Sequence, residues 1–162
     1  MEIWKPLKFG KSGECHQYKN IIRKTYTNHC KERMSNEVNA LTLLRKYKYF
    51  PKIIKIDWNN YMLYMTYVGE SIKKKKRKEL PKNLFQQLNE IEIILKKEGI
   101  HHNDLALGHL MLKNDIVSLI DFEKVYIQNK TPFKKYKINS FKENYMSDLK
   151  NKIIKKFTPS EI

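Results

Sequence analysis

The sequence predicts an α+β fold of bilobal form, with an antiparallel sheet and one helix in the first lobe and a minimal helical second lobe. Three observations support this prediction. Short β-prone runs separated by turn residues fill much of residues 1–68, a segment with helical apolar spacing lies among them, and two aspartates border an apolar hairpin in the second half. We therefore expect a first lobe over residues 1–68 and a reduced second lobe over residues 69–162.

The composition is that of a folded and strongly basic chain. Its 162 residues are 41% apolar and 12% aromatic, which is enough apolar material for a packed core. Lys and Arg outnumber Asp and Glu by 33 to 17, which gives a formal net charge of +16. Such an excess favours an anionic partner, such as nucleic acid, an acidic protein surface, phosphoinositides or a nucleotide. An AT-rich coding sequence would produce the same profile without selection for charge.

The chain lacks the marks of secretion or membrane insertion. No signal peptide is recognisable, and no apolar run approaches the ~18 to 20 residues that span a bilayer. Cys15 and Cys30 are isolated and do not have the spacing of a metal site. We expect an intracellular location, cytoplasmic or nuclear, with both cysteines as thiols.

The first elements expected are strands joined by a turn. The segment from Phe9 to Lys19 has a turn-rich centre, in which Gly10 and Gly13 would let backbone N–H groups approach phosphate oxygens. A plain hairpin would have the same pattern. The β-prone run from Ile21 to Lys24 adds a third strand.

A helix is predicted from Ser35 to Leu44, with Ser35 as its N-cap and an apolar face formed by Val38, Leu41 and Leu44. Two further strands follow, over residues 51–58 and 61–68, joined by a turn at residues 59–60.

Two helices are expected in the second lobe. Residues 84–97 form an amphipathic pattern that ends before Gly99, a natural C-cap. Its apolar face is Leu84, Leu88, Ile91 and Leu95. Residues 141–157 form a basic amphipathic helix. Its inward positions are Tyr145, Leu149, Ile153 and Ile154.

The run Lys73–Lys78 is the strongest charge cluster in the chain. A run of this kind is most often a solvated loop. The alternatives are a nuclear-targeting signal and a contact to nucleic acid or an acidic partner. No aromatic residues are interleaved to stack on bases, which disfavours recognition of single strands.

The stretch from Ile100 to Val125 carries the chemistry. Asp104 follows His102 by two positions and starts a loop, whereas Asp121 ends an apolar run. Two carboxylates so placed can hold a metal ion and an attacking hydroxyl side by side.

These motifs resemble the protein-kinase-like superfamily. The residues His102-Asn103-Asp104-Leu105 match the H-x-D-L catalytic loop, and Asp121-Phe122-Glu123 lies where D-F-G lies in protein kinases. The H-N-D and I-D-F-E variants are similar to choline/ethanolamine kinases and aminoglycoside phosphotransferases. The small size is closer to compact kinases of the RIO type and of the KEOPS complex.

The resemblance implies ATP and Mg²⁺ as cofactors and gives roles to several residues. Asp104 would orient or deprotonate an acceptor hydroxyl, and Asp121 would chelate Mg²⁺ at the β- and γ-phosphates. Lys24 matches the lysine that holds the α- and β-phosphates, and Glu37 matches the helix glutamate that pairs with it. His102 would pack beneath the catalytic loop.

The nucleotide contacts implied by the resemblance involve the first lobe and the hinge. Gly10 matches the first glycine of the glycine-rich loop, and Gly13 is shifted by one position from its counterpart. Main-chain groups around Tyr67 would hold adenine, and Met65 would guard the inner pocket or simply belong to the core. Lys19 is the nearest alternative to the phosphate-binding lysine.

One departure from the kinase pattern concerns the metal. Kinases usually place Asn, a second metal ligand, five residues after the catalytic Asp, and this chain has His109 there. Imidazole suits the hard Mg²⁺ ion less well than an amide oxygen, so Mn²⁺ would be better tolerated. Ala106 stands where many Ser/Thr kinases have a lysine.

A transition-metal site is a chemical alternative. It would be built from His101, His102, Asp104, His109 and Asp121, whose spacing matches no known ligand pattern.

The leading functional hypothesis is an ATP-dependent phosphotransferase that transfers the γ-phosphate to a hydroxyl of a protein or small-molecule acceptor. The alternative is a catalytically impaired pseudokinase, or a basic interaction module that binds an acidic partner or nucleic acid. His109, the imperfect glycine-rich loop and the short second lobe favour this alternative.

Overall fold

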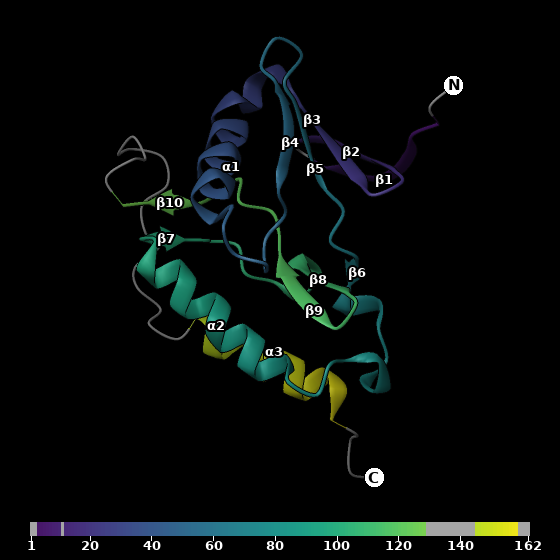
Figure 1. The fold of residues 1–162 in the computed structure, drawn as a ribbon, viewed down its shortest axis with the longest axis vertical. Coiled ribbons are helices and arrows are strands. Elements are labelled where there is room, and N and C mark those ends of the chain that lie inside the picture. The colour runs from purple at the N-terminus through teal and green to yellow at the C-terminus, as the bar shows by residue number, and fades with distance from the viewer. Residues whose placement is uncertain (1–2, 11, 129–144, 159–162) are drawn as a thin grey trace.

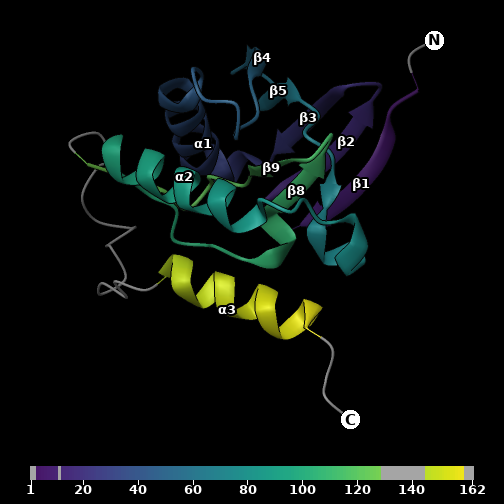
Figure 2. The same cartoon turned by 60° about the horizontal axis from the view of Figure 1, so that its bottom comes forward.

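The structure, a computed structural model, describes residues 3–10, 12–128 and 145–158. One lobe is a five-stranded sheet flanked by helix α1 (Lys31–Leu44), and the other contains two small sheets with helices α2 (Leu84–Lys97) and α3 (Tyr145–Phe157) (Figure 1). The turned view places α3 at the outer edge of the second lobe, beyond α2 (Figure 2). This arrangement confirms the bilobal α+β fold.

The first-lobe sheet is antiparallel throughout, in the spatial order β1-β2-β3-β5-β4. The strands are β1 (Lys5–Gly10), β2 (Gly13–Tyr18), β3 (Ile21–Tyr26), β4 (Ile53–Asp57) and β5 (Met62–Thr66). Strand β3 is central and pairs on both sides, with Lys24 opposite Cys15 in β2 and Leu63 in β5. The backbone of Lys24 is therefore fixed by two neighbouring strands.

Helix α1 begins earlier than the sequence predicts. The prediction that Ser35 caps its N-terminus is wrong, because the helix begins at Lys31 with Cys30 in the N-cap position. Met34 is completely buried, so the apolar face extends beyond Ser35 toward the N-terminus. The predicted apolar face is buried, and Glu37 lies among its residues with only 2% of its surface exposed.

A tight hairpin precedes the second aspartate of the motif. Its turn residues, Asn114 and Asp115, have φ angles of 50° and 60°, which match the twist of a two-residue hairpin. The hairpin strands and a short third strand form one sheet, and two other short strands form a second. These strands are β6 (Glu70–Ser71), β8 (Leu110–Lys113) and β9 (Ile116–Leu119), and β7 (Ile100–His101) with β10 (Tyr126–Ile127).

Helix α2 agrees with its prediction. Its four predicted apolar residues are buried, and it ends before Gly99, whose φ of 65° suits the left-handed residue after a helix.

Helix α3 agrees only in part. Leu149 and Ile153 are buried, but the prediction that Ile154 faces inward is wrong, since it is 50% exposed. Consecutive helical residues point about 100° apart, so burying Ile153 turns Ile154 toward solvent. The predicted helical residues 141–144 and the side chain of Tyr145 lie outside the described part of the chain.

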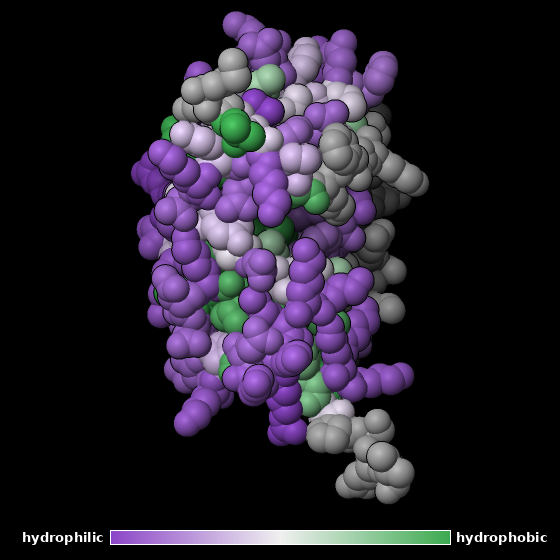
Figure 3. Space-filling view, turned by 90° about the vertical axis from the view of Figure 1, so that its right-hand side faces the viewer, coloured by the Kyte–Doolittle hydropathy of each residue, from purple (hydrophilic) through white to green (hydrophobic). Residues whose placement is uncertain are grey.

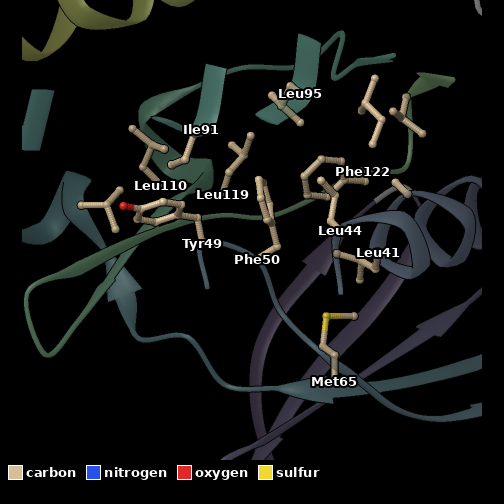
Figure 4. Close-up of a cluster of buried hydrophobic side chains, with 14 of the residues drawn as sticks. Leu41, Leu44, Tyr49, Phe50, Met65, Ile91, Leu95, Leu110, Leu119 and Phe122 are labelled. Atoms are coloured by element: carbon tan, nitrogen blue, oxygen red, sulfur yellow. The ribbon is translucent and has the colours of Figure 1, made fainter. Parts of the chain in front are cut away.

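A continuous apolar core joins the two lobes (Figure 4). The rings of Phe50 and Phe122 meet edge to face with centroids 5.9 Å apart, and both are almost completely buried. Leu44 of α1 and Leu119 of β9 belong to the same buried cluster. Phe122 directly follows Asp121, so this packing fixes the aspartate relative to both lobes.

The basic run at residues 73–78 is mostly exposed, as predicted for a solvated segment, but it contains parts of two short 3₁₀ helices, Ile72–Lys74 and Arg77–Glu79. Ile72 is fully buried and anchors the start of this segment. Lys75 pairs with Glu70 at 2.8 Å.

The surface agrees with the large share of charged residues in the sequence. The face drawn in Figure 3 carries mainly hydrophilic residues with small apolar spots between them. Among the helices of the described ranges, none is both long and apolar enough to cross a membrane. Cys15 and Cys30 carry thiols, as expected.

We predict that Phe122→Ala destabilises the protein by about 3–5 kcal/mol, because it removes a fully buried ring from the core between the lobes. Urea unfolding would measure this loss. Phe85→Ala on α2 is the matched control: that ring is 41% exposed, so the same chemical change there should cost far less. Equal losses for the two variants would contradict the assignment of Phe122 to the core.

Candidate active site

Lys24 is surrounded by three carboxylates. Its Nζ lies 2.6 Å from Glu37 Oε2, 3.1 Å from Asp121 Oδ1 and 2.7 Å from Glu123 Oε1. Glu37 comes from α1, whereas the other two carboxylates follow β9 in the second lobe. The structure therefore brings two predicted site residues, Glu37 and Asp121, into contact with the ammonium of a third, Lys24.

The electrostatics keep Lys24 charged. Burial alone would lower the pKa of its ammonium, but the attraction of Glu37, reinforced by its other neighbours, raises the pKa well above the ordinary value. Burial raises the pKa of the Glu37 carboxyl, against the opposing pull of Lys24. The Tyr26 hydroxyl donates a hydrogen bond to Glu37 Oε2, the oxygen that also binds Lys24.

Asp121 adopts an uncommon backbone conformation. Its φ of 72° lies in the left-handed region, which residues other than glycine rarely occupy. Its Oδ1 contacts Lys24 at 3.1 Å and its Oδ2 contacts His109 Nε2 at 3.2 Å. Burial opposes ionisation, yet the hydrogen bond from His109 and the charge of Lys24 hold the pKa of Asp121 well below its usual range. Asp121 is therefore an ionised carboxylate, the form that binds a cation.

His102 supports the loop from beneath. Burial lowers its pKa to about 4, so the ring is neutral at physiological pH. Its Nε2 lies 2.9 Å from the Ile120 carbonyl oxygen, which can only accept, so Nε2 carries the proton. Its Nδ1 then accepts from the Asp104 N–H at 3.3 Å. The ring also packs edge to face on Phe122 with centroids 4.8 Å apart.

Asp104 lies toward solvent. Its side chain is 36% exposed, and its Oδ2 lies 3.0 Å from Lys124 Nζ. The preceding residue, Asn103, has a φ of 59°, and its amide donates to the Lys124 carbonyl at 3.1 Å. Two contacts thus tie the loop around Asp104 to the segment that follows Asp121.

His109 lies between a carbonyl and a carboxylate. Its Nδ1 is 2.7 Å from the Asp104 carbonyl oxygen, so Nδ1 must carry a proton. Its Nε2 faces Asp121 Oδ2 at 3.2 Å, and this contact requires either a second ring proton or a cation bound by both atoms. Accordingly, the hydrogen bond with Asp121 raises the pKa of His109.

Among the described residues, two overlapping groups of side chains could hold a metal ion, with ligand atoms that lie within 4.8 Å of one another. They are Asp104, His109 and Asp121, and Glu37, Asp121 and Glu123. The second group already surrounds the partly buried ammonium of Lys24. In the first group, the 3.2 Å between His109 Nε2 and Asp121 Oδ2 is close to the ~3.0 Å between adjacent ligands of an octahedral ion with bonds of ~2.1 Å. The first group therefore fits a divalent cation.

The two predicted phosphate-loop glycines pair across the end of the β1–β2 hairpin, Gly10 opposite Gly13. Gly13 has a φ of 145°, and a Cβ there would lie 1.8 Å from the Thr25 carbonyl oxygen, so the sheet itself requires glycine. Ser12 next to it accepts a hydrogen bond from Arg33 of α1. The turn is thereby attached to the helix that supplies Glu37.

The two predicted hinge residues are both engaged in contacts within the protein. Met65 is 5% exposed and belongs to the core. The Tyr67 N–H already donates to the Asn20 carbonyl at 2.8 Å, and its own carbonyl lies 3.4 Å from Lys113 Nζ. Contacts of these residues with adenine therefore stay a prediction, and the Tyr67 N–H is already engaged.

Two residues weighed as alternatives lie in other surroundings. Lys19, in the turn between β2 and β3, has its Nζ 5.1 Å above the Tyr18 ring. His101 on β7 lies against the Tyr126 ring, with centroids 5.8 Å apart. His101 is in neither group of metal-binding geometry that the described residues form.

The sequence did not assign roles to four residues that complete the site. Glu123 and Lys124 directly follow Asp121 and Phe122, and this adjacency was the available signal. Tyr26 and Arg33 gave no signal, because their partners come from other elements. Arg33 Nη1, for example, lies 3.7 Å from Glu123 Oε2.

Comparison with known proteins gives a family and a similar fold. The family model of the RIO domain matches residues 4–136. Among solved structures, the kinase PK-1 of Cydia pomonella granulovirus is similar, with a TM-score of 0.57 and 21% identity over 82% of this chain. The match covers 55% of the viral chain, so this chain spans about half of its length and the likeness concerns the fold. No curated protein matches the chain.

We predict that Lys24→Met lowers the free energy of unfolding by roughly 3–5 kcal/mol at pH 7.5, because it leaves three carboxylates close together without their counter-charge. Repulsion between the charged carboxylates grows as they ionise, so the stability of the variant falls as pH rises and is partly regained toward pH 5.

Urea unfolding at the two pH values checks this prediction. The exposed Lys82→Met serves as the control for loss of a surface charge, with an expected change within about 0.5 kcal/mol. A loss for Lys24→Met that is the same at both pH values would contradict the repulsion.

Proposed function

The chain belongs to the RIO-domain family, and from this premise we propose that it is an ATP-dependent phosphotransferase acting on a hydroxyl group. The observation that carries the proposal is the contact of Lys24 with Glu37 and Asp121, which come from three separate parts of the chain. Phosphoryl transfer needs mainly positioned charges, and this arrangement fixes one cation and one ionised carboxylate at a set distance.

Each residue then has a role in the proposed reaction. Lys24 binds the α- and β-phosphates of ATP, and Glu37 fixes the lysine side chain against α1. Asp104, on the solvent side, accepts the proton of the attacking hydroxyl as the bond to phosphorus forms. His102 keeps the Asp104 backbone in place through the hydrogen bond at 3.3 Å.

Asp121 and His109, with Asp104 nearby, are the residues that would hold a divalent cation. Such an ion neutralises charge on the β- and γ-phosphates. The Asp121 carboxylate is a ligand that Mg²⁺ prefers, whereas the His109 imidazole favours Mn²⁺ more than the amide of an Asn would. We therefore propose Mg²⁺ or Mn²⁺ together with ATP.

The nucleotide would lie between the lobes. Gly10 and Gly13 place a hairpin end near α1, where backbone N–H groups can meet phosphate oxygens. Met65 and Tyr67 are proposed to border the adenine. The acceptor is a protein or small-molecule hydroxyl, and the exposed run Lys73–Lys78 offers a contact for an acidic partner or nucleic acid.

A second candidate function is supported by His109. In the structure this residue contacts Asp121 Oδ2, the oxygen that a metal would need. If a ring proton rather than a metal occupies this contact, the protein would be a pseudokinase that binds partners without turnover.

Metal-dependent nucleotide binding tests the first proposal. We expect ATP with Mg²⁺ or Mn²⁺ to raise the melting temperature of the wild type. Ligand at ~100 times its dissociation constant contributes about 2.7 kcal/mol. Asp121→Asn should abolish the metal-dependent part of this shift. Asp115→Asn in the β8–β9 turn is the matched control and should behave as wild type. A shift that persists in Asp121→Asn, or none in the wild type with either metal, would refute the assignment.

Replacing His109 separates the two candidate functions. We expect His109→Asn to lower the Mg²⁺ concentration needed for ATP binding by roughly tenfold, with a smaller effect on the Mn²⁺ requirement, because an amide oxygen suits Mg²⁺ better. Metal titrations of the thermal shift measure both values. Turnover should rise in this variant if the protein is an enzyme. Silence of both wild type and variant with every acceptor tried would favour the pseudokinase.

A further inference from the structure

Lys124 is a cation at the open side of the site whose contact the proposed mechanism does not use. Its Nζ lies 3.0 Å from Asp104 Oδ2, and the two side chains are 44% and 36% exposed. An exposed ion pair of this kind contributes at most about 1 kcal/mol to stability. Stability alone therefore gives little reason for a lysine at the rim of the site.

The backbone of Lys124 is held firmly although its side chain is exposed. The residues on either side of its turn, Phe122 and Val125, are completely buried, and the Val125 N–H donates to the Phe122 carbonyl at 3.3 Å. Asn103 donates to the Lys124 carbonyl at 3.1 Å. The long side chain thus extends from a fixed base toward the carboxylate of Asp104.

The two lysines of the site differ in how far neighbouring carboxylates compensate their charges. Lys24 already contacts three carboxylates and its side chain is only 18% exposed, so much of its charge is compensated. Lys124 contacts the carboxylate of Asp104 and remains open to solvent. An anionic group that enters beside Asp104 would meet the ammonium of Lys124 first.

The geometry of the proposed reaction places such a group there. A hydroxyl bound to Asp104 lies within ~3 Å of the carboxylate, and its oxygen attacks phosphorus from ~3–3.5 Å. An ammonium 3.0 Å from Asp104 Oδ2 can therefore reach the oxygens of the γ-phosphate by a small change in side-chain torsion.

We propose that Lys124 binds the γ-phosphate of ATP and neutralises its charge during transfer, an inference that rests on the proposed phosphotransferase function. The hydroxyl proton passes to Asp104 as the new O–P bond forms, and the bond between phosphorus and the β–γ bridging oxygen breaks. ADP departs with the electron pair of that bond. Lys124 forms no covalent bond and accompanies the phosphoryl group from donor to acceptor.

The test compares ligands that differ in the γ-phosphate. Calorimetric titrations with ADP and with a non-hydrolysable ATP analogue, both with Mn²⁺, would be made on wild type, Lys124→Ala, Lys124→Arg and Lys82→Ala. We expect Lys124→Ala to weaken binding of the ATP analogue roughly tenfold and to change ADP binding less than about twofold, since a charge-assisted contact is lost from the γ-phosphate alone. Lys124→Arg should retain most of the affinity, and Lys82→Ala should match the wild type.

Two results would overturn the inference, and they differ in what else they refute. If the wild type binds both ligands and Lys124→Ala has an unchanged ratio of affinities, Lys124 has no contact with the γ-phosphate, whereas the proposed function stands. If the wild type binds neither ligand, the phosphotransferase function and the role of Lys124 both fail. A loss of ADP affinity equal to that of the ATP analogue would indicate a structural ion pair and would also overturn the inference.

Discussion

The contact of the partly buried Lys24 ammonium with three carboxylates is the interaction on which the site depends. Three carboxylates from two lobes converge on it, and the pair with Asp121 joins residues 97 positions apart in the chain. Removing such charges from water costs several kcal/mol per ion, so the cluster cannot hold the lobes together alone. The apolar contact of Phe50 with Phe122 supplies the favourable burial that brings Asp121 to Lys24. Core and site are therefore two consequences of one packing arrangement.

The backbone around the site is under constraint at the positions where the chemistry is proposed. Asn103 and Asp121 both have left-handed φ angles, 59° and 72°. Asn and Asp tolerate this conformation better than most residues, but it still has a cost that surrounding contacts must offset. The buried His102 ring helps to offset this cost at both positions. Its Nδ1 accepts a hydrogen bond from the N–H of Asp104, which follows Asn103, and its Nε2 donates one to the carbonyl of Ile120, which precedes Asp121. One neutral histidine thus sets the positions of both aspartates.

The sequence predicted the parts of this protein that local pattern determines. The strands and the helix ending before Gly99 follow from spacing and turn chemistry, and the motifs around Asp104 and Asp121 led to the fold. The turn predicted at residues 59–60 is longer than expected and spans residues 58–61 between β4 and β5. The sequence-based predictions were wrong where tertiary packing determines the position of a helix start or of a side chain. Ser35 is a good capping residue, but the helix begins earlier because Met34 is buried. Ile154 is apolar, but it is exposed because the neighbouring Ile153 occupies the buried face of the helix. The three-carboxylate cluster was beyond prediction, because Glu123 reaches Lys24 only once the lobes are packed.

The charge of the site contrasts with that of the chain. The whole chain carries a formal net charge of +16, which draws anions toward it. At the site, however, four carboxylates, those of Glu37, Asp104, Asp121 and Glu123, face the ammonium groups of Lys24 and Lys124. Arg33, whose Nη1 lies 3.7 Å from Glu123 Oε2, adds a third cation, and the hydrogen bond with Asp121 raises the pKa of His109, so the site has no surplus positive charge for a triphosphate. Under the proposed function, a triphosphate would need additional positive charge there, so the same carboxylates that position Lys24 would make its binding dependent on a divalent cation. Under the same proposal, the surface would therefore attract the nucleotide, whereas the site would admit it only together with a metal.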